Sequence, residues 1–216
     1  MQITIREPGS AITHYIGMML SLVAAVPLLM KAEISSVPSA IAAMGIFILT
    51  MILLYAASTL YHSLNVGDRI LKVLRKLDHM MIFVLIAGTY TPICLLVLRG
   101  RTGMLLLCAI WGIAVVGMLL KAFWINCPKW FSSVIYIAMG WVCLFVFPVL
   151  LKTLPVQAFA WLLAGGILYT VGGVVYALKL KGFNGLHKYF GSHEIFHLFV
   201  MGGSFCHFVV MYFYVL

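Results

Sequence analysis

Long apolar runs alternate with short polar segments along the whole chain. Seven of these runs come close to the roughly 20 residues that a membrane-spanning helix needs. The connections between them are short, which leaves no room for a soluble domain. The pattern therefore predicts an all-α fold, a single domain built as a bundle of seven transmembrane helices. The predicted spans cover residues 11–30, 39–61, 80–98, 104–123, 132–151, 156–178 and 194–216.

Composition supports the same conclusion. Of the 216 residues, 64% are hydrophobic and only 9% are charged, whereas soluble domains carry about 25% charged residues. The first run is too long for the apolar region of a signal peptide, and the segment 27–31 offers no small-residue cleavage site. We therefore interpret it as a retained helix of a polytopic membrane protein.

The basic residues predict an orientation. The chain has fourteen Lys and Arg residues and a net charge of +9. With a cytoplasmic N-terminus, ten of the fourteen fall on inner segments and four on outer loops, so the positive-inside rule favours the N-terminus in the cytoplasm and the C-terminus outside. The excess indicates contact with anionic membrane lipids and not with nucleic acid. The four outer residues are Lys31, Arg99, Arg101 and Lys152.

Small residues and one proline mark special positions within the spans. Gly165 and Gly172 lie seven residues apart on one helix face, which would let a neighbouring helix approach closely. Pro92 is expected to kink the third helix, where neighbouring groups can satisfy the freed backbone carbonyl. Both features are interpreted as packing devices.

Ionisable residues inside a membrane are costly and therefore indicate function. His62 ends the second predicted helix and Asp78 starts the third, while His193 and His197 open the seventh. The orientation derived from Lys and Arg places all four at the cytoplasmic face. Three helices thus bring potential ligands to one depth.

The spacing of the histidines predicts a metal site. His193 and His197 are four residues apart, so they lie on one helix face, roughly 6 Å apart along the axis. With His62 they supply three imidazoles, the donor set of a catalytic zinc site with an open position. Other divalent metals also accept imidazole, but Zn²⁺ is favoured. Asp78 could then handle the proton of a water, and the hydroxyl of Ser58 could bind a substrate, a water or a ligand.

Simpler interpretations stay open for several of these residues. Asp78 could pair with Arg75, Lys76 or His79 at the membrane surface. Ser58 could donate a hydrogen bond to its own helix backbone. The remaining histidines are interpreted as interfacial or hydrogen-bonded residues; His207, roughly 15 Å from His197 along its helix, is too far to share the same ion and is expected to be buried and hydrogen-bonded. These residues are His14, His79, His187 and His207.

A haem site fits the pattern less well than a metal ion. Two axial histidines must approach the ring from opposite sides, whereas His193 and His197 lie on one helix. The pair also completes the letters of the H-E-x-x-H protease motif, in which Glu194 would be the general base. That motif needs a third ligand of its own, which His62 already provides, so Glu194 is instead expected to face Lys181, Lys188 or headgroup water.

Several stretches resemble the bacterial hemolysin III family. They are "ITHYIG", "STLYH", "LDHMMIFVLIAGTYTP" and "HEIFHLFVMGGSFCHF", in the order and on the helices typical of that family. The family is related to the progestin and adipoQ receptors and, more distantly, to the alkaline ceramidases. The resemblance implies a seven-helix protein of the bacterial inner membrane, with zinc ligands at His62, His193 and His197, an acidic partner at Asp78 and a serine at Ser58.

What the resemblance implies about activity divides into three hypotheses. The first is a zinc-dependent hydrolase of membrane lipid amides or esters, or a factor in membrane-lipid homeostasis. The second is a cytolytic, pore-forming hemolysin with a structural zinc; a homo-oligomer is compatible with it. The third, the most remote, is an intramembrane metalloprotease. The sequence identifies no protein partner.

Overall fold

The computed structural model describes residues 5–178 and 190–216 and contains no strand within them. Seven of the described helical segments are long and apolar enough to cross a membrane, which confirms the predicted fold class. His187, Lys179, Lys181 and Lys188 lie outside the described residues. The elements are α1 (Pro8–Ile34), α2 (Ala40–Ser63), α3 (Asp68–Pro92), the π-helix η1 (Ile93–Leu98), α4 (Gly100–Phe123), α5 (Lys129–Gly140), the 3₁₀-helix η2 (Trp141–Val146), α6 (Phe147–Thr153), α7 (Val156–Leu178), α9 (Ser192–Val210) and the π-helix η3 (Met211–Val215).

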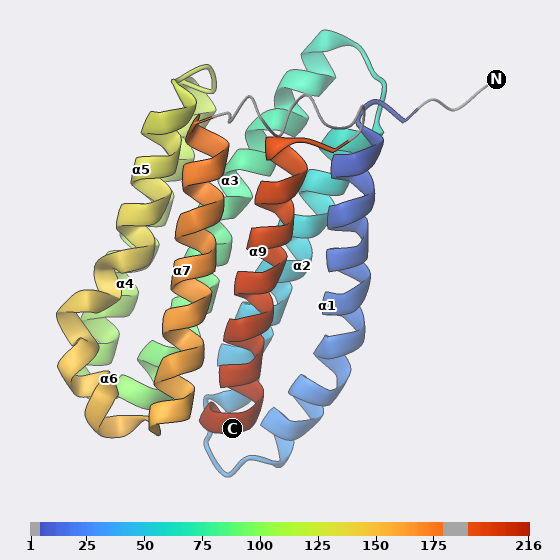
Figure 1. Cartoon of the computed structure of the whole chain (residues 1–216). Coiled ribbons are helices and arrows are strands. Elements are labelled where there is room, and N and C mark those ends of the chain that lie inside the picture. The colour runs from blue at the N-terminus through green and yellow to red at the C-terminus, as the bar shows by residue number, and fades with distance from the viewer. Residues whose placement is uncertain (1–4, 179–189) are drawn as a thin grey trace.

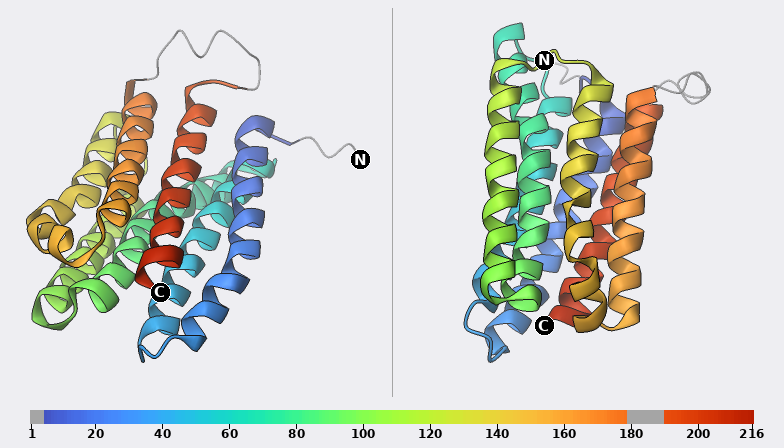
Figure 2. Two further views of the ribbon diagram at one scale, coloured as in Figure 1. Left: turned by 60° about the horizontal axis from the view of Figure 1, so that its bottom comes forward. Right: turned by 90° about the vertical axis from the view of Figure 1, so that its left-hand side faces the viewer.

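The spans form a closed ring with one helix outside it. Going round the ring, α9 packs against α1, α1 against α2, α2 against α3, α3 against α5, α5 against α7 and α7 against α9. Helix α4 packs mainly on the outer side of α3 (Figure 1; Figure 2). The ring brings the C-terminal end of α2 and the first turns of α1 and α9 to one end of the bundle, and the chain's C-terminus lies at the other end (Figure 1).

The third span is longer than its hydropathy predicts. Helix α3 begins at Asp68 and not near residue 80, so the prediction that Asp78 starts this helix is wrong. The added turns carry Arg69, Lys72 and Arg75 and are amphipathic, so a search for apolar runs misses them. The α-helix ends at Pro92, where the hydrogen-bond pattern changes to the π-helix η1.

The fifth span is not one continuous α-helix. It is predicted as a single run over 132–151, but a 3₁₀ segment divides it into α5 and α6. At the break, the hydroxyl of Tyr90 from α3 accepts a hydrogen bond from the backbone N–H of Cys143 (2.8 Å) and donates one to the carbonyl of Gly140 (2.6 Å). A side chain inserted into the helical ladder is a recognised cause of such breaks, and here it also satisfies backbone groups inside the membrane.

Glycines of α7 permit the close contact with α9. A Cβ atom at Gly172 would lie 2.8 Å from the Cβ of Phe199, and one at Gly165 would overlap the ring of His207. Both neighbours belong to α9, so the predicted close approach of another helix at these two positions is confirmed. Helix α9 is thereby held at a fixed register against α7, and that register positions the histidines at its start.

Candidate metal centre

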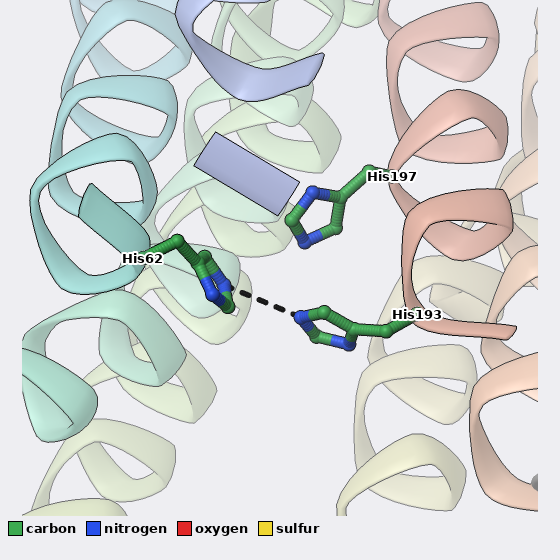
Figure 3. Close-up of side chains that lie close together, drawn as sticks. All are labelled: His62, His193 and His197. Atoms are coloured by element: carbon green, nitrogen blue, oxygen red, sulfur yellow. Dashed lines mark hydrogen bonds between the residues drawn. The ribbon is translucent and has the colours of Figure 1, made fainter. Parts of the chain in front are cut away.

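Three histidines from two helices meet at one end of the bundle. His62 lies on the last turn of α2, and His193 and His197 lie on the first turns of α9 (Figure 3). One ring nitrogen from each of the three lies within 4.8 Å of the others. The Nε2 atoms of His62 and His193 are 3.2 Å apart. The structure therefore brings together all three residues that the sequence predicts as metal ligands.

The first turns of α1 lie against this histidine cluster, which consists of His62, His193 and His197. A carboxylate oxygen of Glu7 accepts a hydrogen bond from Nδ1 of His62. The hydroxyl of Thr13 lies 3.0 Å from Nδ1 of His197. The hydrogen bond with His62 lowers the pKa of Glu7 below its usual value, against the effect of partial burial, which raises it.

Asp78 and Ser58 lie beside the cluster. Asp78 is close enough to interact electrostatically with His62 and His193. Its Oδ2 atom is also 3.2 Å from Nδ1 of His79, so the simpler interpretation of a contact with His79 describes part of its surroundings. Ser58 is 1% exposed, and its hydroxyl has no partner within hydrogen-bond distance among the described residues, so it does not bond its own helix backbone. The nearby carboxylate of Asp78 is the group with which it interacts.

His14 is a residue of this site that sequence reasoning misassigns. It is only 3% exposed, and its ring stacks on His197 with the ring centroids 3.5 Å apart and the planes 8° apart. Neither of its nitrogens has a hydrogen-bond partner among the described residues. The interpretation of His14 as an interfacial or hydrogen-bonded residue is therefore wrong. The only sequence feature that could have indicated a role for His14 in the site is its position in "ITHYIG", one α-helical turn beyond Ser10.

Glu194 has partners that its sequence neighbourhood does not suggest. Its carboxylate accepts a hydrogen bond from the hydroxyl of Ser10 on α1 and one of 2.8 Å from the backbone N–H of Gly191. Neither Lys181 nor Lys188 lies among the described residues, so their predicted contact with Glu194 falls outside them. Glu194 caps the start of α9 and ties it to α1, because an acceptor in the first turn satisfies a free N–H group.

An apolar cavity of about 180 Å³ adjoins the histidine cluster. Every helix of the ring contributes to its lining, whereas α4 does not. Along the third span the lining extends from Asp78 on α3 to Ile93 at the start of η1, which corresponds to roughly 20 Å of helix. A dry apolar cavity of about 150 Å³ is already large enough to hold a small apolar ligand. Asp78 and four of the five lining histidines, His14, His79, His193 and His197, lie at the histidine end, and Tyr90, Thr170 and His207 bring polar groups to the rest of the lining.

The donor set fits a divalent metal ion. Imidazole nitrogens are the ligands that zinc, copper, nickel and iron accept, and three of them leave a coordination position free. Buried polar atoms without partners are rare in proteins and call for a ligand, an ion or a water. Such atoms belong to His14, Ser58 and His193, the last through its Nδ1 atom, and to His79 beside Asp78.

Comparison with known proteins identifies the family of the chain. The family model described as haemolysin-III related matches residues 2–208. The chain belongs to the haemolysin-III related family. Within the family, "Hemolysin-3" of Bacillus cereus is 40% identical over 210 residues, which cover 97% of this chain and 92% of that protein. "Hemolysin-3 homolog" of Bacillus subtilis (strain 168) is 38% identical over 212 residues, which cover 98% and 95%.

The match extends over nearly the whole chain of this haemolysin-III family member, and seven of the described helical segments can span a membrane. The chain is therefore a multi-pass bacterial membrane protein. Its relatives' names mention no metal and no substrate. The orientation of the termini across the membrane stays a prediction from the placement of Lys and Arg.

Proposed function

We propose that this protein is a zinc-dependent hydrolase that acts on amides or esters of membrane lipids, and thereby serves membrane-lipid homeostasis. The observation that carries the proposal is the position of the histidine cluster at one end of an elongated apolar cavity inside the bundle. A polar head group would meet the histidines, and the hydrocarbon chain would occupy the cavity. Three imidazoles with a free coordination position are the donor set of hydrolytic zinc sites.

A bound zinc ion would supply Lewis acidity, which activates a water and polarises a carbonyl. The protein's own residues would do the rest. The carboxylate of Asp78 would accept the proton that the attacking water releases, and would pass it to the leaving amine or alkoxide. The unpartnered hydroxyl of Ser58 would donate a hydrogen bond to the carbonyl oxygen as negative charge develops on it. The apolar lining would keep bulk water away from the hydrocarbon chain.

The test is lipid hydrolysis by the purified protein in nanodiscs. Ceramide-like amides and phospholipids would be offered separately, and fatty-acid release would be measured by mass spectrometry. We expect release from one of these classes, a loss of at least about 100-fold in Asp78→Asn, and a comparable loss in His197→Ala. Glu33→Gln is the matched control for Asp78→Asn, because Glu33 is an exposed carboxylate at the other end of α1.

The result that rules out the proposal is equally specific. Fatty-acid release that survives both chelation and His197→Ala would come from a contaminating enzyme. If Asp78→Asn is active and His197→Ala is inactive, the metal site keeps its proposed role, but Asp78 is not the proton acceptor.

A second candidate function follows from the name of the relatives. "Hemolysin-3" of Bacillus cereus is named for cytolysis, so the alternative is a pore-forming hemolysin in which zinc has only a structural role. The cavity lining is largely apolar away from the histidine end, and a water-filled pore would need polar lining. Dye leakage from liposomes, together with metal-dependent melting and no lipid turnover, would favour this alternative.

In the metalloprotease hypothesis, Glu194 would have to act as the general base. Both carboxylate oxygens of Glu194 are engaged, one by Ser10 and the other by Gly191. A general base must reach the water that it activates. Proteolysis lost in Glu194→Gln but retained in Asp78→Asn would restore this hypothesis.

A further inference from the structure

Helix α1 and Glu7, the residue just before it, contact two of the three histidines of the cluster. Glu7 accepts a hydrogen bond from Nδ1 of His62, which belongs to α2. Thr13 contacts Nδ1 of His197, which belongs to α9. Both contacts are made with Nδ1 of the histidine ring. In both histidines, Nε2 is therefore left free of contacts with this segment.

Counting protons fixes the tautomer of His62. An ionised carboxylate carries no proton and can only accept hydrogen bonds. The side chain of Glu7 is 45% exposed to solvent, and a carboxyl group of that kind is ionised at neutral pH. Nδ1 of His62 must therefore carry the proton, so Nε2 keeps its lone pair for a metal ion.

The same count applies to His197. Thr13 has a single hydroxyl proton, and its oxygen lies 2.9 Å from the carbonyl of Ser10 and 3.1 Å from that of Gly9. Carbonyls only accept, and both lie within hydrogen-bond distance of the hydroxyl, so we assign the hydroxyl proton to one of them. The hydroxyl oxygen is then the acceptor for Nδ1–H of His197, and Nε2 of His197 again keeps its lone pair.

Other contacts hold this part of α1 in place. The backbone N–H of Glu7 donates to the carbonyl of His62 at 3.0 Å. The guanidinium of Arg6 donates to the carbonyl of Tyr61 at 2.6 Å and lies over the Tyr61 ring. Ser10 donates to Glu194 at the start of α9. The first turns of α1 are thus fixed to both ligand-bearing helices.

We infer that Glu7 and Thr13 are positioning residues of the metal site: they fix the Nδ1–H tautomers and the ring orientations of His62 and His197, so that both Nε2 atoms face a metal ion. The inference rests on the metal binding proposed above. Partners of this kind typically change metal affinity by about 10–100-fold. His193 differs from the other two, since its Nδ1 atom has no partner among the described residues.

The test measures the Zn²⁺ affinity of purified protein in detergent by competition with a chromogenic chelator. We expect Glu7→Ala and Thr13→Val to bind Zn²⁺ about 10–100-fold more weakly than wild type, and Glu7→Asp and Thr13→Ser to recover most of the affinity. Circular dichroism of the metal-free variants should show the same helix content as the controls, so that a lower Zn²⁺ affinity reflects ring positioning and not unfolding.

Two controls match the chemistry of the variants. Glu33→Ala removes an exposed carboxylate from the other end of α1. Thr91→Val removes a threonine hydroxyl that, like that of Thr13, bonds a carbonyl of its own helix, here Ala87, and faces a ring N–H, here of Trp111 at 3.2 Å. Neither control residue contacts the histidine cluster, so both should bind Zn²⁺ as wild type does.

The outcomes separate this inference from the proposed function. A wild-type protein that binds no metal defeats the proposed function. If the wild type binds metal and the Glu7→Ala and Thr13→Val variants bind it with the same affinity, the positioning role is overturned. Should either variant fail to fold, ¹⁵N NMR of histidine-labelled wild type decides: Nδ1–H tautomers at His62 and His197 support the inference, and Nε2–H tautomers overturn it.

Discussion

Two polar clusters lie along the buried face of α9, and they differ in how their hydrogen bonds are completed. The histidine cluster leaves polar atoms of His14, Ser58 and His193 without a partner among the described residues. Farther along the helix, the hydroxyl of Ser204 bonds the hydroxyls of Tyr55 (2.8 Å) and Tyr169 (2.9 Å). We call Ser204, Tyr55, Tyr169 and the adjacent His207 the serine cluster.

The difference separates a site for a ligand from a structural network. In the serine cluster, His207 bonds the carbonyl of Gly203 at 2.8 Å and its ring stacks on Tyr169. The prediction that His207 is buried and hydrogen-bonded is therefore confirmed. Its partners are all protein groups, so nothing further is needed to stabilise it. Unsatisfied buried polar groups cost about 1–3 kcal/mol each, so a bound ion and ligand would stabilise the histidine cluster.

The largest difference in Zn²⁺ affinity should be seen when one histidine of each cluster is replaced by alanine. His197→Ala should lower Zn²⁺ affinity at least about 100-fold, because it removes one of three ligands. His207→Ala should leave the affinity unchanged, although both residues lie on α9. Elemental analysis and chelator competition on the two purified variants check this. Equal loss of metal in both would erase the distinction between the clusters.

An intermediate effect should come from the serine cluster. Ser204→Ala leaves two buried tyrosine hydroxyls without their shared partner, which should cost about 1–3 kcal/mol of stability. Thermal melting of the metal-free protein in detergent measures the loss, and Zn²⁺ affinity should stay at the wild-type value. A melting temperature equal to that of wild type would show that these hydrogen bonds do not stabilise the bundle.

The smallest effect on stability should come from Ser58→Ala. Ser58 and Ser204 are both buried serines, with 1% and 3% exposure, but the Ser58 hydroxyl has no partner within hydrogen-bond distance among the described residues. Its removal should change stability by less than about 0.5 kcal/mol, while lipid hydrolysis should fall if the hydroxyl contacts the substrate. A destabilisation as large as that of Ser204→Ala would assign Ser58 to a structural network.

The sequence predicts the seven spans and the three clustered histidines because both depend on short-range patterns. Apolar length determines a span, and the four-residue spacing of His193 and His197 determines a shared face. Asp78 was misplaced at the start of α3, because the basic turns after Asp68 are helical without being apolar. Glu7 and His14 went unrecognised because their roles depend on which helices adjoin α1. That pairing is a property of the closed ring and not of any segment.

The joint between Tyr90 and the broken fifth span has a consequence for how the protein is made. The N–H of Cys143 and the carbonyl of Gly140 are completed by a hydroxyl from a different span. Inserted alone, that segment would expose uncompensated peptide groups to hydrocarbon. Tyr90 precedes Gly140 in the chain, so the ribosome delivers the hydroxyl to the membrane before the break that requires it. The order of synthesis therefore matches the order in which the two spans depend on each other.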